Sequence, residues 1–166
     1  QQFQYNTTWS PEIVGNSVRL RSSASAYLSR TPASAGNTQV FTQSFWLKRG
    51  KLATNQFSGV CVSGSANYGL FFDTNDILNV YVYYTGSVWQ GQLITTQVFR
   101  DPSAWYHIVL AVDTTQATAN DRLKLYVNGV QVTTFSTTNN PTQNADLGIN
   151  QASATYIGLS NSQYFD

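Results

Sequence analysis

The chain of 166 residues lacks, or has very few of, several residue types that would indicate a particular chemistry or location. It has one cysteine, Cys61, so no disulfide can form within the chain, and this count alone leaves the compartment undecided. It has no methionine, even at position 1, which predicts a processed, trimmed or partial gene product. No apolar run approaches the roughly eighteen residues that a membrane-spanning helix needs, so we expect no membrane insertion.

Charged residues are also scarce. They make up 10% of the chain and leave a formal net charge of +1 at pH 7. Nucleic-acid binding depends on clustered Lys and Arg side chains that neutralise phosphates, so this balance excludes a broad nucleic-acid interface. The surface must instead be polar through hydroxyl and amide groups, which is typical of extracellular and virion proteins.

Acidic side chains are too few and too scattered for glycoside hydrolysis, which uses two carboxyl groups about 5 to 9 Å apart. Glu12 is the only glutamate, and it lies in an irregular N-terminal stretch. Asp73 and Asp76 are the closest acidic pair in the sequence, but the Asp-Thr-Asn-Asp segment that they bound has the composition of a turn. We therefore predict no catalytic residues and no enzymatic activity.

Metal and nucleophile motifs are missing as well. The single histidine, His107, is predicted to be a core residue of a buried strand, and Cys61 a small buried hydrophobe. No spacing of His and Cys suits zinc. We expect no cofactor. Calcium is the alternative, because scattered loops can supply its oxygen ligands, and Asp113 and Asp146 are the candidate ligands.

What the chain does contain is typical of β structure. Aromatic residues make up 14% of it, Val and Thr are abundant, and no helical period of useful length is present. Residues 1–16 have no clear period and are interpreted as a lead-in or arm. Residues 17–166 are predicted to form one domain, since a chain of this length buries roughly 70% of its unfolded surface around a single core.

Turn-punctuated runs predict roughly ten or eleven short strands in an all-β, two-sheet antiparallel jelly-roll sandwich. Alternation puts Phe41, Phe45 and Leu47 on a core face, and Asn128-Gly129 is a hairpin turn because both residues accept a positive φ. Residues 105–113 are almost continuously apolar, which predicts a central strand buried on both sides. The other predicted strands are 17–20, 27–29, 57–63, 68–73, 77–84, 88–95, 123–127, 130–135 and 155–159, with a turn at 63–65 and a long loop over 136–151.

Aromatic residues out of phase with the core are the most informative feature. Flat rings on a sheet face stack on sugars, while neighbouring Asn and Gln side chains bind hydroxyl groups. The alternative is that these rings pack beneath loops or against a neighbouring subunit. The candidate glycan-binding residues, predicted to share one sheet face, are Trp46, Tyr81, Tyr83, Trp89 and Tyr126.

Three ordered segments resemble the laminin-G-like domains of the concanavalin A-like jelly-roll superfamily. They are Ser44-Phe45-Trp46-Leu47-Lys48, then Trp105-Tyr106-His107-Ile108-Val109 leading to Leu125-Tyr126-Val127-Asn128-Gly129-Val130, then Tyr156-Ile157-Gly158. The segments 21–30 and 47–50 are similar to such domains in structural proteins of tailed phages, particularly marine phages.

The resemblance implies a binding module for glycans, proteins and sometimes calcium. In such domains the Tyr-Ile-Gly segment leads to a last strand, whereas here the sequence stops at Phe165-Asp166. We therefore expect that strand to be missing from the sequence, to be supplied by a neighbouring chain or to lie in a continuation of this one, since an unpaired sheet edge would otherwise be exposed.

Two functional hypotheses follow. The first is a non-enzymatic structural or decoration domain on the surface of a phage virion, in the head, tail or a fibre, with adhesion to a host surface or glycan. Its partners would be other virion proteins and further copies of itself in a homo-oligomer. The alternative is a glycan-binding, lectin-like module of a secreted or adhesive extracellular protein.

Overall fold

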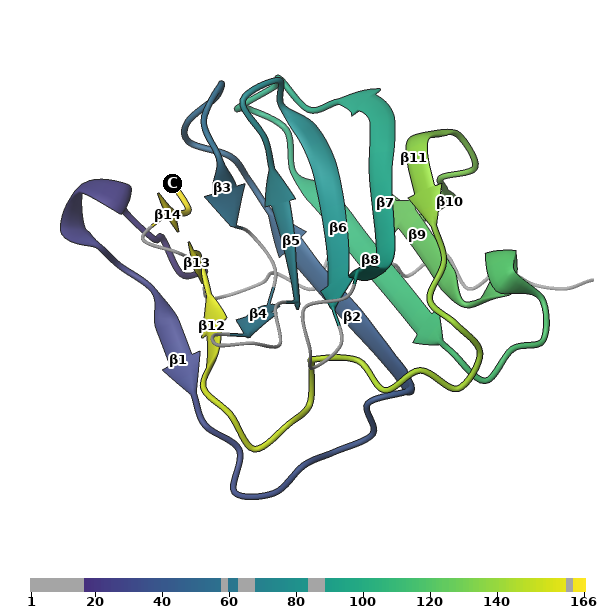
Figure 1. The fold of residues 1–166 in the computed structure, drawn as a ribbon. Coiled ribbons are helices and arrows are strands. Elements are labelled where there is room, and N and C mark those ends of the chain that lie inside the picture. Colours follow the sequence, from purple (N-terminus) through teal and green to yellow (C-terminus); the bar gives the residue numbers. More distant parts are fainter. Residues whose placement is uncertain (1–16, 58–59, 63–67, 84–88, 161–162) are drawn as a thin grey trace, which may run out of the picture.

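Two antiparallel sheets that lie face to face account for most of the strands in the computed structural model, which describes residues 17–57, 60–62, 68–83, 89–160 and 163–166 (Figure 1). The strands are β1 (Leu28–Arg30), β2 (Val40–Leu47), β3 (Gln56–Phe57), β4 (Val60–Val62), β5 (Tyr68–Phe72), β6 (Ile77–Tyr83), β7 (Trp89–Val98), β8 (Tyr106–Asp113), β9 (Leu123–Val127), β10 (Val130–Gln131), β11 (Phe135–Asn139), β12 (Thr155–Ile157), β13 (Leu159–Ser160) and β14 (Gln163–Tyr164). The described residues also form two turns of 3-10 helix, η1 (Ser22–Ala24) before β1 and η2 (Ala119–Asp121) between β8 and β9.

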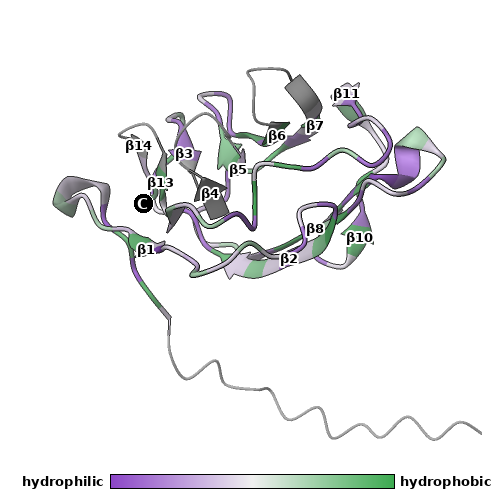
Figure 2. Ribbon diagram, turned by 60° about the horizontal axis from the view of Figure 1, so that its bottom comes forward, coloured by the Kyte–Doolittle hydropathy of each residue, from purple (hydrophilic) through white to green (hydrophobic). Residues whose placement is uncertain are grey.

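The larger sheet has eight strands in the order β1-β12-β4-β5-β6-β7-β11, with β3 paired to β5 beside this path. The smaller sheet has four strands in the order β10-β9-β8-β2. Strands β13 and β14 form a separate two-stranded hairpin. The two layers are visible in Figure 2, with β5 and β6 in the upper layer and β2 and β8 in the lower. The predicted all-β antiparallel sandwich is therefore confirmed.

The core lies between the two sheets and follows from the strand period of two. Along β8 every second residue is buried, and Ile108 and Leu110 have no exposed surface. Complete burial of such a side chain is worth about 1.5–3 kcal/mol. The larger sheet contributes Leu70, Phe72, Leu78, Val80, Val82 and Leu93 to this core, and the smaller sheet contributes Leu47, Tyr106, Val112, Leu123, Leu125 and Val127.

Several local predictions are confirmed. In β2, Leu47 is buried and Phe41 and Phe45 pack against the core, while Trp46 lies on the opposite face. The hairpin between β9 and β10 turns at Asn128 and Gly129, whose φ angles of 51° and 80° are both positive, as the Asn-Gly dipeptide predicted.

Three predicted segments are wrong. The run 130–135 is not one strand, since β10 ends at Gln131 and β11 begins at Phe135 in the other sheet. Residues 17–20 form no strand, because no neighbouring strand in the described part of the chain pairs with them. The stretch 136–151 is not wholly loop: β11 crosses from the smaller sheet to the larger one and pairs with β7 through Thr138↔Leu93 and Asn139↔Gln92. As the edge strand of its sheet, β11 stays largely exposed, so its sequence lacks the apolar alternation that would have revealed it.

The central position of β8 in its sheet is confirmed, but its burial on both sides is wrong. Only the inner face is buried, while Val109 and Ala111 on the outer face are half-buried. The prediction of His107 as a core histidine is wrong for the same reason, since His107 belongs to the outer face of β8. A continuous apolar run cannot distinguish a strand covered on both faces from one whose outer face carries small or amphipathic residues.

Some predictions fall outside the described residues. These are the lead-in 1–16, the turn at 63–65 and the side chain of Cys61. The last strand, missing or supplied by a neighbour, stays a prediction. In the described part of the chain, no helix has the length and apolar character needed to cross a bilayer.

Candidate functional site

An exposed tryptophan stacks on the histidine across from it on the outer face of the smaller sheet. Trp46 of β2 lies opposite His107 of β8 in the strand register. Their rings are 4.8 Å apart between centroids and nearly parallel, at 14°. The indole of Trp46 nevertheless remains open to solvent, since the residue is 60% exposed.

His107, whose imidazole supports this indole, is held by one bond at its side chain and another at its backbone. Its Nε2 lies 2.9 Å from the Oγ of Ser44, which precedes Trp46 by two residues and therefore points to the same face. The backbone N–H of His107 donates to Oδ1 of Asn128 at 2.8 Å, so the hairpin turn fixes this end of β8. We refer to Ser44, Trp46 and His107 together as the Trp46 platform.

The structure divides the five predicted rings between the two sheets. Tyr126 of β9 belongs to the sheet of Trp46, where its register partner is Val109 of β8. Tyr81, Tyr83 and Trp89 belong instead to β6 and β7 of the larger sheet. The five candidates therefore do not lie on one face, because strand alternation alone does not tell which sheet a strand joins.

The rings of the larger sheet are only partly described. Tyr81 stacks on Phe71 at 5.2 Å between centroids, with 19° between the ring planes. Burial raises the pKa of the Tyr81 phenol, and a hydrogen bond to the side chain of Gln92 partly offsets this effect. The backbones of Tyr83 and Trp89 pair across β6 and β7, and their side chains lie outside the described residues.

A groove of about 390 Å³ lies between β1 and β12 of the larger sheet and β2 of the smaller one. Gln43 lines it and is only 9% exposed, with its Oε1 accepting a hydrogen bond from the hydroxyl of Tyr68 at 3.1 Å. Its Nε2 has no hydrogen-bond partner among the residues that the structure describes. The remaining lining residues are Leu28, Ser29, Arg30, Pro32, Phe41, Thr42, Ile149, Asn150, Thr155 and Ile157.

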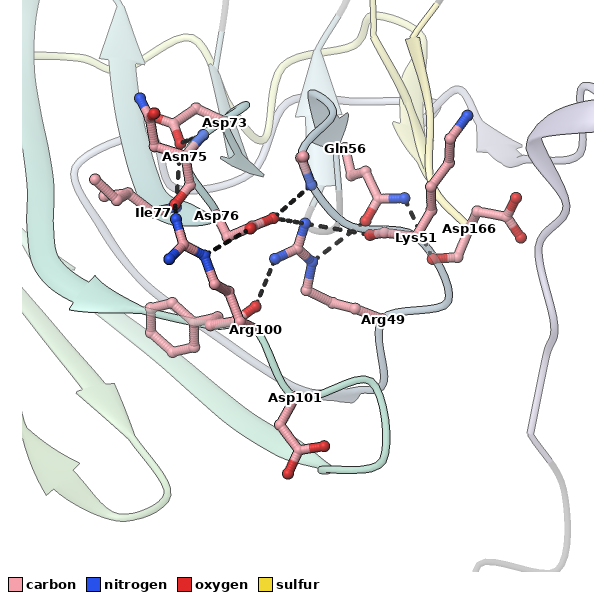
Figure 3. Close-up of polar contacts among 12 residues, drawn as sticks. Arg49, Lys51, Gln56, Asp73, Asn75, Asp76, Ile77, Arg100, Asp101 and Asp166 are labelled. Carbon is pink, nitrogen blue, oxygen red and sulfur yellow. Dashed lines mark hydrogen bonds and ion pairs between the residues drawn. The ribbon is translucent and has the colours of Figure 1, made fainter.

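A buried charge network joins three loops at one end of the sandwich (Figure 3). Arg49 follows β2, and its Nη2 donates to Oδ1 of Asp76, in the β5–β6 turn, at 2.9 Å. Its other donors reach Oε1 of Gln56 at 3.3 Å and the carbonyl oxygen of Phe99 at 2.6 Å. The guanidinium also lies 4.4 Å from the ring centroid of Phe72, a cation–π contact.

This network keeps Asp76 ionised. Burial alone would raise the pKa of its carboxyl, but bonds from the N–H of Ala53, from Arg49 and from Arg100 outweigh that effect and lower the pKa. A carboxylate held in this way does not serve as a proton donor near neutral pH. The predicted turn at Asp73 is confirmed, because its Oδ1 accepts from the N–H groups of Asn75 and Ile77.

The two calcium candidates are already hydrogen bonded. Asp113 accepts from the hydroxyl of Thr115 at 2.6 Å and from Nε2 of Gln116 at 2.6 Å, and these bonds lower the pKa of its carboxyl. Asp146 accepts from the hydroxyl of Thr38 at 2.8 Å and from the side chain of Gln39 at 3.0 Å. The described residues include no group of three or more His, Cys, Asp or Glu that could hold a metal ion, so calcium binding stays a prediction.

The sequence reasoning missed both the stacking role of His107 and the buried Arg49–Asp76 pair. The alternation along β8 could have revealed the position of His107, because His107 shares a face with Val109 and lies on the face opposite to Ile108. No local pattern reveals the Arg49–Asp76 pair, because its members are 27 residues apart and meet only through the packing of loops.

Residues 22–166 match a family model described as the concanavalin A-like lectin/glucanases superfamily. No curated protein matches the sequence.

Proposed function

The chain belongs to the concanavalin A-like lectin/glucanases superfamily, and from this premise we propose that it is a non-enzymatic adhesive module that binds carbohydrate on the Trp46 platform. The observation that supports this proposal is the exposed indole of Trp46, held parallel to His107. A flat ring fixed before binding can stack on the C–H face of a sugar with little further loss of conformational freedom. The hydroxyl of Ser44 adds a polar group beside this surface.

The lack of enzymatic activity is part of the proposal. Asp76 is bonded to two arginines, and Asp101 and Asp113 each accept hydrogen bonds that lower the pKa of their carboxyls. Glycoside hydrolysis instead needs one carboxyl group with a raised pKa, which acts as the general acid. These carboxylates therefore suit loop structure better than catalysis.

The location of the module is a separate hypothesis. A chain with 10% charged residues and a polar surface of hydroxyl and amide groups suits an extracellular setting or a virion surface. The phage virion role, the homo-oligomer and the virion partners remain predictions from the sequence resemblance. A glycan ligand for the platform is compatible with either location.

Binding to a broad glycan array tests the proposal, with Trp46→Ala and Trp46→Phe measured beside the parent chain. We expect the parent to bind one class of glycan and Trp46→Ala to lose about tenfold in affinity or more. Aromatic contacts contribute about 0.5–1.5 kcal/mol beyond their buried area, and 1.4 kcal/mol corresponds to tenfold. Trp46→Phe keeps a flat ring and should retain part of the affinity.

The control is Tyr27→Ala, which removes an exposed ring that precedes β1 in the larger sheet and makes an edge-type contact with Tyr156 of β12. It should bind glycan as the parent does. An array on which the parent binds nothing would overturn the proposal. Equal binding by the parent and Trp46→Ala would place the sugar elsewhere and overturn the role of the platform.

A further inference from the structure

We propose that the groove between β1 and β2, here called the β1–β2 groove, is a second binding site that accepts an extended strand of another protein carrying a carboxylate. This site uses the backbone edge of β2, whereas the Trp46 platform uses side chains on the outer face of the sheet, so the two are separate although Ser44 belongs to both. Four features of the described residues support it: two open sheet edges, a buried amide donor without a partner there, an apolar lining and a cation that makes no ion pair there.

The sheet edges come first. Among the described residues, β2 is the outermost strand of the smaller sheet and β1 the outermost strand of the larger one. The groove is lined by three consecutive residues from each, 41–43 and 28–30. Side chains of consecutive strand residues point to opposite faces, so a groove that contacts all three runs along the strand edge rather than across one face.

The backbone of β2 offers hydrogen-bonding groups to this groove. The carbonyl oxygen of Gln39 points toward β8, since it accepts a hydrogen bond from the N–H of Thr114. The pairing of β2 with β8 then continues from residue 40 to residue 47 without a shift in register. Because backbone groups alternate in direction along an antiparallel strand, the N–H and C=O of Thr42 and Ser44 point away from β8, toward the open edge. An added strand would pair with these groups.

The amide of Gln43 adds a specific requirement. A buried donor without a partner costs about 1–3 kcal/mol, so native structures rarely leave one. The Nε2 of Gln43 is such a donor in the lining of the groove. A backbone carbonyl of an added strand would satisfy it once the Gln43 side chain turns toward the groove, because Nε2 itself is buried in the free chain.

The side chains of the lining define the chemistry of the occupant. Leu28, Ile149 and Ile157 give aliphatic surface that suits Val, Ile or Leu side chains on one face of a strand. The ring of Phe41 already makes an edge-type contact with the ring of Tyr68, at 5.9 Å between centroids and 68° between planes. Aliphatic walls beside an open strand edge favour a polypeptide over a sugar.

Arg30 determines the charge that we expect. It is exposed, lines the groove, and forms no ion pair with any residue that the structure describes. A carboxylate on the occupant would complement it, and a bidentate Arg–carboxylate pair would also fix the register of the added strand. The occupant is therefore an extended, apolar segment with an acidic side chain.

A capped hexapeptide tests the proposal. Its sequence alternates threonine with valine and has aspartate in place of the central threonine, because β-branched residues favour an extended backbone. We expect saturable binding to the whole chain, with slower amide hydrogen exchange at Thr42 and Ser44. The amides of Gln43 and Phe45 face β8 in the ladder and should change little.

Two variants and one modified peptide separate pairing from nonspecific adhesion. Arg30→Glu should weaken the aspartate peptide about tenfold and favour a peptide with lysine in its place. Gln43→Leu should weaken both peptides. A peptide that is N-methylated at alternate residues cannot pair with a strand edge and should not bind.

Several results would overturn the proposal. They are no binding at millimolar peptide, binding without added protection of Thr42 and Ser44, and equal binding of the N-methylated peptide. Protection of these amides in the free chain together with a dimer on size analysis would mean that a second copy fills the groove, which also excludes a foreign strand. None of these results bears on glycan binding at Trp46.

Discussion

Arg49 and Asp76 form an ion pair of 2.9 Å in which the two side chains are 0% and 4% exposed. The pair connects the loop after β2 with the β5–β6 turn, and so ties the edge of the smaller sheet to the middle of the larger one. Arg100 approaches the second carboxylate oxygen from outside at 3.1 Å and is itself 64% exposed. Among the described residues, Asp76 is therefore the one carboxylate that forms an ion pair with the buried Arg49.

Asp76→Asn should destabilise the chain by about 3–5 kcal/mol, because it leaves the Arg49 charge buried without a counterion. Asparagine tolerates the left-handed backbone of this position, whose φ is 63°, so the effect would come from the lost charge rather than from strain. Urea unfolding at pH 7 measures it.

The matched control is Asp121→Asn, which breaks the surface pair between Asp121 and Lys124 and should cost less than about 1 kcal/mol. Replacing both buried partners, in Arg49→Met with Asp76→Asn, should recover part of the loss seen in Asp76→Asn alone. Equal stability of Asp76→Asn and the parent would contradict the prediction.

Acid should remove the stabilisation that Asp76 provides. The pKa of its carboxyl is lowered in the folded chain, despite burial, by the bonds from Ala53, Arg49 and Arg100. A lowered folded pKa gives stability that is complete above the unfolded pKa of about 3.9 and is lost as the pH falls through the folded value. Unfolding free energies measured from pH 7 down to pH 2 should therefore fall more steeply below about pH 4 for the parent than for Asp76→Asn. Parallel curves would contradict this assignment.

Strand alternation was enough to predict the sandwich. Burial alternates along β2 and β9, so the period of two can be recognised in their sequences. The dipeptide Asn128-Gly129 predicts the hairpin between β9 and β10 directly. The prediction was wrong where a strand is exposed on both faces, because such a strand shows no alternation of apolar and polar residues. Strand β11 was missed because an exposed edge strand needs no apolar face, although Thr137 and Thr138 still pair with β7.

The site was predictable only in part. Trp46 is out of phase with its strand's core residues, and this correctly placed it on the outer face. Which of the five rings would share a sheet depends on the strand order β10-β9-β8-β2, which is set by long-range pairing and leaves no local mark in the sequence. The groove could not be predicted from the sequence for the same reason, since residues of β1, β2 and β12, which are far apart in the chain, form its walls.

Alanine at Gly91 should destabilise the chain by about 1–3 kcal/mol through overpacking. An added Cβ would lie 2.5 Å from Cγ2 of Val82 and 3.0 Å from Cδ of Pro141. Because the clash is local, Val82→Ala in the same chain should recover part of the loss, as thermal unfolding would show. A Gly91→Ala chain as stable as the parent would contradict this packing.

Alanine at Gly129 should cost about 1–2 kcal/mol for a different reason, because its φ is +80° while an added Cβ would meet nothing within 4 Å. Gly129→Asn should therefore cost less than Gly129→Ala, since asparagine tolerates this conformation. Thermal unfolding of the two variants measures the difference. Equal losses for the alanine and asparagine variants would mean that backbone conformation does not set the cost.

His107 should act on glycan binding by positioning Trp46 rather than by contributing to the core. The imidazole is not part of the buried core, so His107→Ala should change the unfolding free energy by less than about 1 kcal/mol. Without its stacking partner the indole regains rotamers whose restriction costs about 0.5–1.5 kcal/mol, which predicts a two- to tenfold weaker affinity for sugar. The near-ultraviolet circular dichroism of Trp46 should weaken in parallel, while His107→Phe restores both signals by keeping a flat partner. A loss of stability without a change in the tryptophan signal would instead assign His107 a purely structural role.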